Sequence, residues 1–212
     1  MIHTYGDSHA DFSFRNIESI IKHPVASITM KSAGKESNIK HIKKMFKDFG
    51  IKRKDNIILC FGEIDCRAHI HNEEDKNKAI EGLVENYFKT IIALRNKYIN
   101  IIIMSVPPPA HNTIIITHEF PFRGSDNERS GYTKKMNELI ESNCKKNDIC
   151  FLNIYNDYKD EKGMLKTELS NDKLDCDVHI GDTSFIKKRL QTMGILSDKI
   201  EKSNKWYNRL FK

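Results

Sequence analysis

The sequence predicts an α/β protein built on an open, mostly parallel, five-stranded sheet with helices on both faces. Strand-like and helix-like segments alternate about five times along the 212-residue chain, which is the pattern of this fold class. Two strand-like segments, 56–61 and 99–106, are nearly continuous apolar runs, as expected of parallel strands covered on both faces. The length suits one domain. We therefore expect a single domain over residues 1–212, in which residues from about 196 to 212 could form an extension.

The individual elements follow from the spacing of apolar side chains and from turn residues. Apolar residues three and four positions apart indicate a helix, and short apolar runs ended by turn residues indicate strands. The expected strands are a run ending at Gly6 and residues 25–30, 56–61, 99–106 and 149–154. The expected helices cover residues 12–21, 39–49, 75–97, 132–144 and 185–193. The irregular segment from Ala110 to Asp126 is a candidate lid or rim loop.

Composition narrows the class of protein. The chain is 39% hydrophobic and 30% charged, has no apolar run long enough to span a bilayer and shows no secretory signal. We therefore expect a cytoplasmic protein without a membrane partner. Its five cysteines include no Cys-x-x-Cys pair, which favours reduced thiols over disulfides or structural zinc. The net charge of +6 comes from lysines scattered over most segments, so no nucleic-acid partner is expected. The oligomeric state stays open.

The first candidate for chemistry is Gly6-Asp7-Ser8, at the end of the first expected strand. Glycine permits a tight turn there, and a helix-like stretch follows, so Ser8 is suited to act as a displayed nucleophile. A serine nucleophile needs a base and a group that orients the base. The candidate base is His179, late in the chain, with Asp175 and Asp177 both close enough to support it.

Other polar residues follow the ends of the expected strands. These are Gly34, the block from Glu63 to Arg67, and the segment from Pro107 to His111. Because parallel strands bring their carboxyl ends to one edge, where such sheets bind ligands, these residues should meet Ser8. Gly34, Asp7, Glu63, Asp65 and Arg67 form the candidate oxyanion and substrate-binding set. Arg67 could hold an anionic or polyhydroxyl substrate, or Asp65 and Arg67 could simply bridge neighbouring loops.

These blocks, in this order, resemble the SGNH, or GDSL, hydrolases. The resemblance rests on Gly6-Asp7-Ser8, Gly34, the Gly-x-x-Asp block at 62–65 and the late Asp/His block, and it spans roughly Ile2 to Leu190. It implies a flavodoxin-like, three-layer α/β/α fold and acyl-ester chemistry without a metal or other cofactor. It further implies that Ser8 is the nucleophile, His179 the general base and Asp175 the orienting acid. The backbone N–H groups of Ser8 and Gly34 would donate to the oxyanion.

The sequence departs from the family pattern at two positions. The family usually has an oxyanion-binding Asn where this chain has Ile64. Such a donor is typically worth about 2.7–4 kcal/mol of transition-state stabilisation, so its loss should be felt. Arg67 or a polar group of segment 107–118 is a candidate substitute. The family also usually has its Asp three residues before the histidine, where this chain has Cys176. Asp175 is favoured over Asp177, which is too near His179 to support it easily.

The predicted function is a serine-dependent esterase that removes or transfers a small acyl group, such as O-acetyl, with a glycan or small-molecule ester as substrate. Two alternatives remain. A two-metal phosphoesterase would use Asp7, His9, Asp65 and His179 as metal ligands. A protein of the same fold without catalysis would bind a glycan or a partner in the cleft, which is consistent with the missing Asn.

Overall fold

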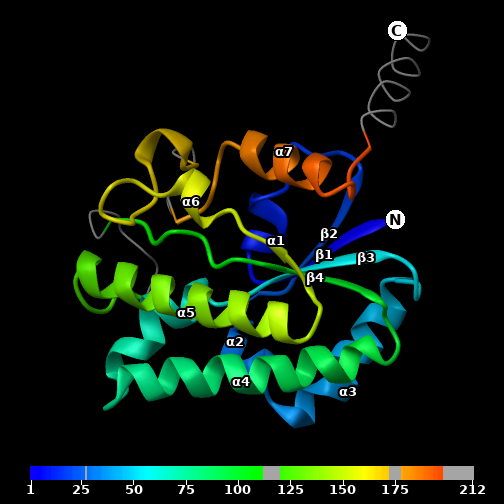
Figure 1. Ribbon diagram of the computed structural model, residues 1–212, viewed down its shortest axis with the longest axis horizontal. Helices are drawn as coiled ribbons and strands as arrows, with labels where there is room; N and C mark the ends of the chain where they lie inside the picture. Colours follow the sequence, from blue (N-terminus) through cyan, green and yellow to red (C-terminus); the bar gives the residue numbers. More distant parts are fainter. Residues whose placement is uncertain (27, 112–119, 172–177, 198–212) are drawn as a thin grey trace, which may run out of the picture.

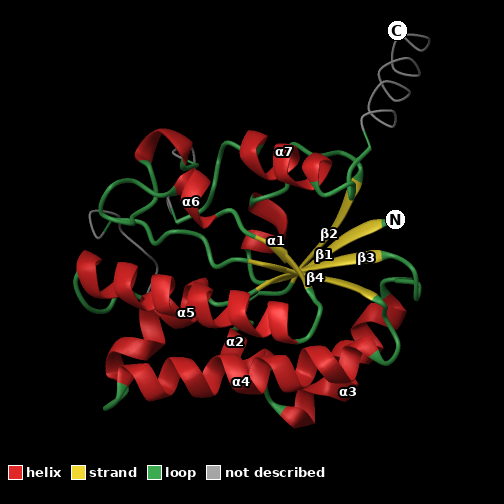
Figure 2. Cartoon of the chain, in the orientation of Figure 1, coloured by secondary structure: helices red, strands yellow, loops and turns green. Residues whose placement is uncertain are grey.

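The computed structural model describes residues 1–26, 28–111, 120–171 and 178–197. Its centre is a five-stranded parallel sheet with the strand order β2-β1-β3-β4-β5, seen as a fan of strands between helical layers in Figure 2. The strands are β1 Ile2–Gly6, β2 Ile20–Pro24, β3 Asn56–Cys60, β4 Asn100–Met104 and β5 Cys150–Leu152. The predicted fold class, a three-layer α/β/α protein with a five-stranded parallel sheet, is confirmed.

Helices cover both faces of the sheet (Figure 1). The longer helices are α3 Glu36–Asp48, α4 Lys76–Arg95, α5 Asp126–Lys146 and α7 Ser184–Thr192. The short ones are α1 His9–Phe12, α2 Met30–Ala33 and α6 Tyr155–Tyr158, with helical turns η1 Asp65–His69, η2 Ile70–Asn72 and η3 Thr167–Leu169. Apolar residues of α3, α4 and α5 form the core on one face, and those of α1 and α7 form the core on the other.

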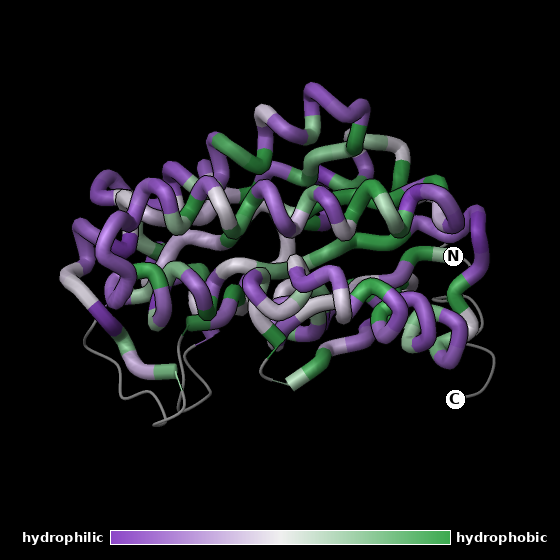
Figure 3. Tube along the Cα trace, turned by 90° about the horizontal axis from the view of Figure 1, so that it is seen from below, coloured by the Kyte–Doolittle hydropathy of each residue, from purple (hydrophilic) through white to green (hydrophobic). Residues whose placement is uncertain are grey.

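Strand β3 shows how the sheet supplies both cores. Ile57 and Leu59 belong to the core beneath α3, α4 and α5, whereas Ile58 and Cys60 belong to the core beneath α1 and α7. Successive strand side chains point to opposite faces, so a continuous apolar run is required at this position. Figure 3 shows the result as a hydrophobic centre with hydrophilic residues along the outer helices.

The helix boundaries follow local signals in the sequence. Asp75 caps α4 by accepting a hydrogen bond from the backbone N–H of Lys78 at 2.9 Å. Ser125 and Glu128 cap each other's backbone at the start of α5, a capping box that lengthens this helix beyond the predicted 132–144. Gly50, with φ +71°, follows the end of α3 as predicted.

Two early elements were predicted wrongly. After α1 ends at Phe12, residues 13–19 form turns rather than the predicted helix over 12–21, and the second strand is Ile20–Pro24 rather than 25–30. β2 is an edge strand that is only partly buried and contains Lys22 and His23, so it lacks the continuous apolar run of a central strand. Phe14 and Ile17 are buried as helical spacing suggested, but they reach the core from consecutive turns.

Residues 198–212, including Trp206, lie outside the described residues, so the single-domain prediction with an extension from about 196 stays a prediction. Within the part of the chain that the structure describes, no helix is both long and apolar enough to cross a membrane.

Candidate active site

The turn after β1 presents Ser8. Gly6 pairs with Cys60 of β3 so closely that a Cβ at Gly6 would lie 1.8 Å from the Cys60 carbonyl oxygen. The backbone N–H of Asp7 donates to that same oxygen at 3.1 Å. The Asp7 side chain then accepts a hydrogen bond from the backbone N–H of His9 at 2.9 Å, a local turn that Asp favours. Ser8 thus stands between the end of β1 and the start of α1, as the sequence predicted.

The structure brings Ser8 and His179 together. Ser8 Oγ lies 2.7 Å from His179 Nε2, within hydrogen-bond distance for a nucleophile and its base. When the imidazole is neutral and Nε2 carries no proton, the serine hydroxyl donates to it. His179 is buried, and its carbonyl accepts a hydrogen bond from Asn171 N–H at 2.9 Å. These contacts hold His179 beside Ser8 at the carboxyl edge of the sheet.

Two aromatic contacts to His179 were not predicted. The Phe12 ring stacks on the His179 ring with centroids 3.9 Å apart and planes 18° apart. The His9 ring lies 4.9 Å from it at 45°. His9 and Phe12 are three residues apart in α1, so they share a helix face. That spacing was visible in the sequence, but the partner of this face was not.

Asp175 and Asp177 are the two acids proposed to orient His179. Both lie outside the described residues, so the choice between them stays a prediction from the sequence.

Asp7 and His9 are both buried beside Ser8. Burial raises the pKa of Asp7 well above its usual range, and the nearby carboxylate of Glu63 raises it further. Burial lowers the pKa of His9 well below its usual value, and His179 and Arg67 lower it further. His9 is therefore a neutral imidazole at neutral pH. Neither of its ring nitrogens has a hydrogen-bond partner among the described residues.

Glu63 and Arg67 form a buried ion pair at the end of β3. Arg67 Nε lies 2.7 Å from Glu63 Oε1, and Nη2 lies 3.1 Å from Oε2, so the contact is bidentate. Arg67 Nη1 also donates to the carbonyl of Phe120. The guanidinium therefore joins η1 to the residues before α5, which favours the structural role over substrate binding. Nor does this arrangement support Arg67 as a replacement for the missing oxyanion Asn at Ile64, which is itself buried.

Asp65 caps a helix. It is fully buried, and it accepts hydrogen bonds from the backbone N–H groups of Met30 at 2.6 Å and Lys31 at 3.4 Å. Its carboxylate thereby satisfies donors at the start of α2. His69 Nδ1 also lies 3.5 Å from it. These hydrogen bonds give Asp65 a structural role that ties η1 to α2, and its substrate-binding role stays a prediction.

The oxyanion role predicted for Gly34 is not supported. Its N–H donates to the Met30 carbonyl at 2.8 Å and closes α2. A Cβ at this position would lie 3.0 Å from the backbone nitrogen of Tyr87 in α4, so the glycine permits helix packing. Gly34 and Asp65 both line a cavity of about 450 Å³ near α4 whose lining does not include Ser8.

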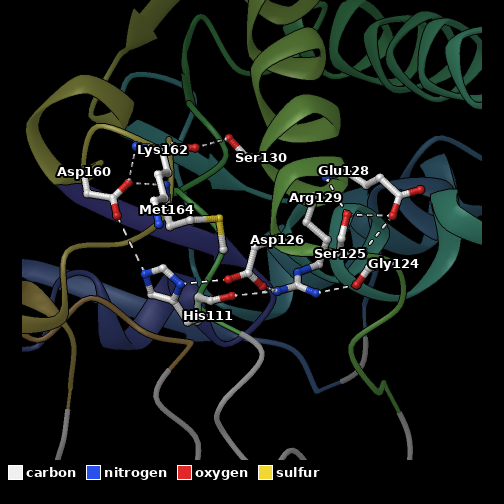
Figure 4. A network of polar contacts seen from close by, with 11 residues as sticks. His111, Gly124, Ser125, Asp126, Glu128, Arg129, Ser130, Asp160, Lys162 and Met164 are labelled. Carbon is white, nitrogen blue, oxygen red and sulfur yellow. Dashed lines mark hydrogen bonds and ion pairs between the residues drawn. The ribbon is translucent and has the colours of Figure 1, made fainter.

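The segment predicted as a lid or rim loop is described only at its two ends. Figure 4 shows His111 between Asp126 and Asp160, with Nδ1 2.8 Å from Asp126 Oδ2 and Nε2 3.7 Å from Asp160 Oδ2. The buried Arg129 donates to the carbonyls of Ala110 at 3.1 Å and Gly124 at 2.8 Å. Both ends are thus fixed to the start of α5. The loop's role stays a prediction.

The two-metal alternative finds no support in the geometry. Asp65 directs its carboxylate to the N–H groups of α2, and His179 Nε2 faces Ser8. Among the residues that the structure describes, no group of three or more His, Cys, Asp or Glu side chains is arranged to hold a metal ion.

Comparison with known proteins places the fold. No protein-family model matches the sequence, and no curated protein sequence is significantly similar to it. A GDSL-like lipase from Bacteroides thetaiotaomicron is similar in structure, with a TM-score of 0.62 at 14% identity over 92% of this chain and 86% of that one. A putative acylhydrolase from Bacteroides fragilis gives a TM-score of 0.63 at 11% identity over 92% and 85% of the two chains.

An acetylxylan esterase from Geobacillus stearothermophilus, solved as a catalytic mutant, also matches. Its TM-score is 0.56 at 8% identity over 92% of this chain and 94% of that one. At such low identities the likeness concerns the fold alone. The chain has the fold of the GDSL-type, or SGNH, hydrolases, and it carries a hydrogen-bonded serine and histidine at the carboxyl edge of the sheet.

Proposed function

We propose that this protein is a serine-dependent carboxylic ester hydrolase that acts through an acyl-enzyme on Ser8. The observation that carries the proposal is the 2.7 Å contact between Ser8 Oγ and His179 Nε2. These residues are remote in sequence, yet the fold joins them where an α/β sheet receives ligands. The similar structures described as a lipase, an acylhydrolase and an acetylxylan esterase support the same reaction class.

The proposed reaction has two steps. Ser8 Oγ forms a bond to the ester carbonyl carbon while its proton passes to His179 Nε2. The tetrahedral intermediate collapses, the imidazolium gives the proton to the leaving alkoxide, and an acyl-Ser8 ester remains. Water then attacks this ester with His179 again as base, which releases a carboxylic acid and restores the serine. A sugar hydroxyl in place of water would make the reaction an acyl transfer.

An orienting acid and an oxyanion donor complete the proposed catalytic site. Asp175 is the proposed acid that holds the imidazole in the tautomer with Nε2 free to accept. The backbone N–H of Ser8 remains the proposed oxyanion donor, since the N–H of Gly34 is used within α2.

The proposed substrate is an ester of a small acyl group. O-acetylated carbohydrate is the first substrate class to test, because acetylxylan esterases share this fold.

The simplest test compares hydrolysis of p-nitrophenyl acetate by the natural protein and by Ser8→Ala. Loss of the nucleophile should lower kcat/KM at least about a thousandfold. Ser37→Ala, at an exposed position in α3, is the matched control and should retain full activity. Equal activity of Ser8→Ala and the natural protein would exclude the assignment. Absence of activity in a correctly folded natural protein would favour the non-catalytic binding alternative.

A further inference from the structure

We infer that Phe12 is a positioning residue for His179, and that its ring favours the protonated imidazole while Arg15, on the other face of the ring, opposes this effect. The inference rests on the proposed function for its kinetic consequences. The contacts of Phe12 with His179 and Arg15 do not depend on that function.

His179, Phe12 and Arg15 form one stack. The His179 and Phe12 ring centroids are 3.9 Å apart, and the Arg15 guanidinium carbon lies 3.8 Å from the Phe12 centroid. Two groups so close to one ring centroid cannot share a face, so His179 and Arg15 lie on opposite faces of Phe12. The guanidinium also binds Asp11 through Nε at 3.3 Å and Nη2 at 3.1 Å, which holds it over the ring.

The stack orients the His179 imidazole and favours its protonated form. Near-parallel stacking prevents the ring of His179 from tilting away from Phe12, and so keeps Nε2 directed at Ser8 Oγ. An aromatic face also attracts a cation. In the proposed reaction His179 becomes an imidazolium when it accepts the serine proton, so Phe12 stabilises the state that forms during the reaction.

Other titratable and charged groups lie near the His179 ring. His9 packs on His179 from α1 but is neutral, since burial lowers its pKa well below the usual value. Arg67 lies close enough to His9 to lower that pKa further. Asp11 partly balances Arg15. Asp175 and Asp177, which precede His179 in sequence, lie outside the described residues. The Arg15 side chain is 45% exposed, so its effect on His179 should weaken as salt concentration rises.

The inference predicts opposite changes for two neighbouring residues. Phe12→Leu removes the aromatic face, so the midpoint for protonation of His179 should move to lower pH by roughly half a unit. Arg15→Gln removes a cation beyond the ring, so the midpoint should move to higher pH by a smaller, salt-sensitive amount. Phe12→Tyr keeps the stack and should leave the midpoint near its natural value. A merely structural role of Phe12 would not produce this pattern.

The direct measurement is an NMR titration of the histidine Cε1–H signals of the whole protein. The nine histidines require an assignment, which the spectrum of His179→Gln provides. The same variants are assayed on p-nitrophenyl acetate, where Phe12→Leu should lower kcat roughly three- to thirtyfold with little change in KM, and Phe12→Tyr should restore it.

Unchanged midpoints in both Phe12→Leu and Arg15→Gln, or shifts in the same direction, would overturn the inference. The titration needs no catalysis, so it separates this inference from the proposed function. The predicted shifts in a protein that does not hydrolyse esters would support the stack and contradict the esterase.

Discussion

Arg67 and Glu63 form a bidentate ion pair in which both side chains are nearly excluded from solvent, with 7% and 5% of their surfaces exposed. The pair sits directly after β3, in the block that the sequence suggested could bind substrate. A buried pair is weak evidence of net stabilisation, but removing one partner leaves an uncompensated charge. The pair therefore gives a sharp test of whether this block is structural.

Glu63→Gln should lower the free energy of unfolding by about 3–5 kcal/mol, because Arg67 would keep its buried charge without a counter-charge. Denaturant unfolding measures this directly. The control is Lys44→Ala, which breaks the Lys44–Asp48 pair on α3, where the side chains are 74% and 53% exposed. That change should stay within about 1 kcal/mol. Similar small losses in both variants would reopen the substrate-binding interpretation of Arg67.

Gly6→Ala should prevent the close pairing of β1 with β3, because the new Cβ would lie 1.8 Å from the Cys60 carbonyl oxygen. We expect a loss of about 3 kcal/mol or more in unfolding free energy. Gly82→Ala is the matched control, since a Cβ there meets nothing within 4 Å in the middle of α4. It should raise stability by about 0.5–1 kcal/mol. If the two variants behaved alike, the described turn before Ser8 would be wrong.

His9→Leu should make stability less dependent on pH. The pKa of His9 is lowered in the folded protein, so below about pH 6.5, the usual histidine value, the unfolded chain binds a proton that the folded protein does not. The contribution of His9 to the free energy of unfolding is therefore complete above that pH. It falls as pH decreases, by at most about 1.4 kcal/mol per pH unit. Urea unfolding at several values between about pH 7.5 and pH 5, the range around the usual histidine pKa, measures how the free energy of unfolding changes with pH.

The control for this prediction is His41→Gln, which changes an exposed histidine on α3 and should keep the natural slope. His3 and His23, whose pKa values are also lowered mainly by burial, remain in both variants and contribute equally. An unchanged slope in His9→Leu would show that His9 is not a buried neutral imidazole.

Much of the fold was readable from the sequence because the central strands and long helices carry strong patterns. β3 and β4 are apolar on both faces, and α4 has an aspartate cap before a regular apolar stripe. β2 was misplaced because an edge strand need not be apolar throughout, whereas Val25 and Ile28, which follow it, are apolar but lie outside the strand. The extent of α5 depends on its Ser125–Glu128 capping box, which the apolar spacing alone does not show.

The sequence predicted the residues of the site that follow expected strands, but not the contacts that depend on how distant segments pack. Ser8 and His179 follow from the order of the strand-end blocks, and the structure joins them. The role of Gly34 could not be judged from sequence, because whether its N–H is available depends on α2, whose single turn has no clear periodic pattern. The Phe12–His179 stack joins distant segments, so no local pattern could reveal it.

The choice between Asp175 and Asp177 gives a prediction about catalysis. Asp175→Asn should lower kcat on p-nitrophenyl acetate by roughly a thousandfold or more, because an amide would favour the wrong imidazole tautomer. Asp177→Asn is the matched variant two residues away and should reduce kcat far less. The reverse order of effects would assign the orienting role to Asp177.

The central claim is that Ser8 is a nucleophile activated by His179. The most direct measurement is labelling with a fluorophosphonate probe followed by mass spectrometry of the modified peptide. We predict covalent modification of Ser8 within the tryptic peptide from Met1 to Arg15, with loss of labelling in Ser8→Ala and strong slowing in His179→Gln. Absence of labelling in the natural, folded protein, or labelling of Ser13 in the same peptide with Ser8 untouched, would contradict it.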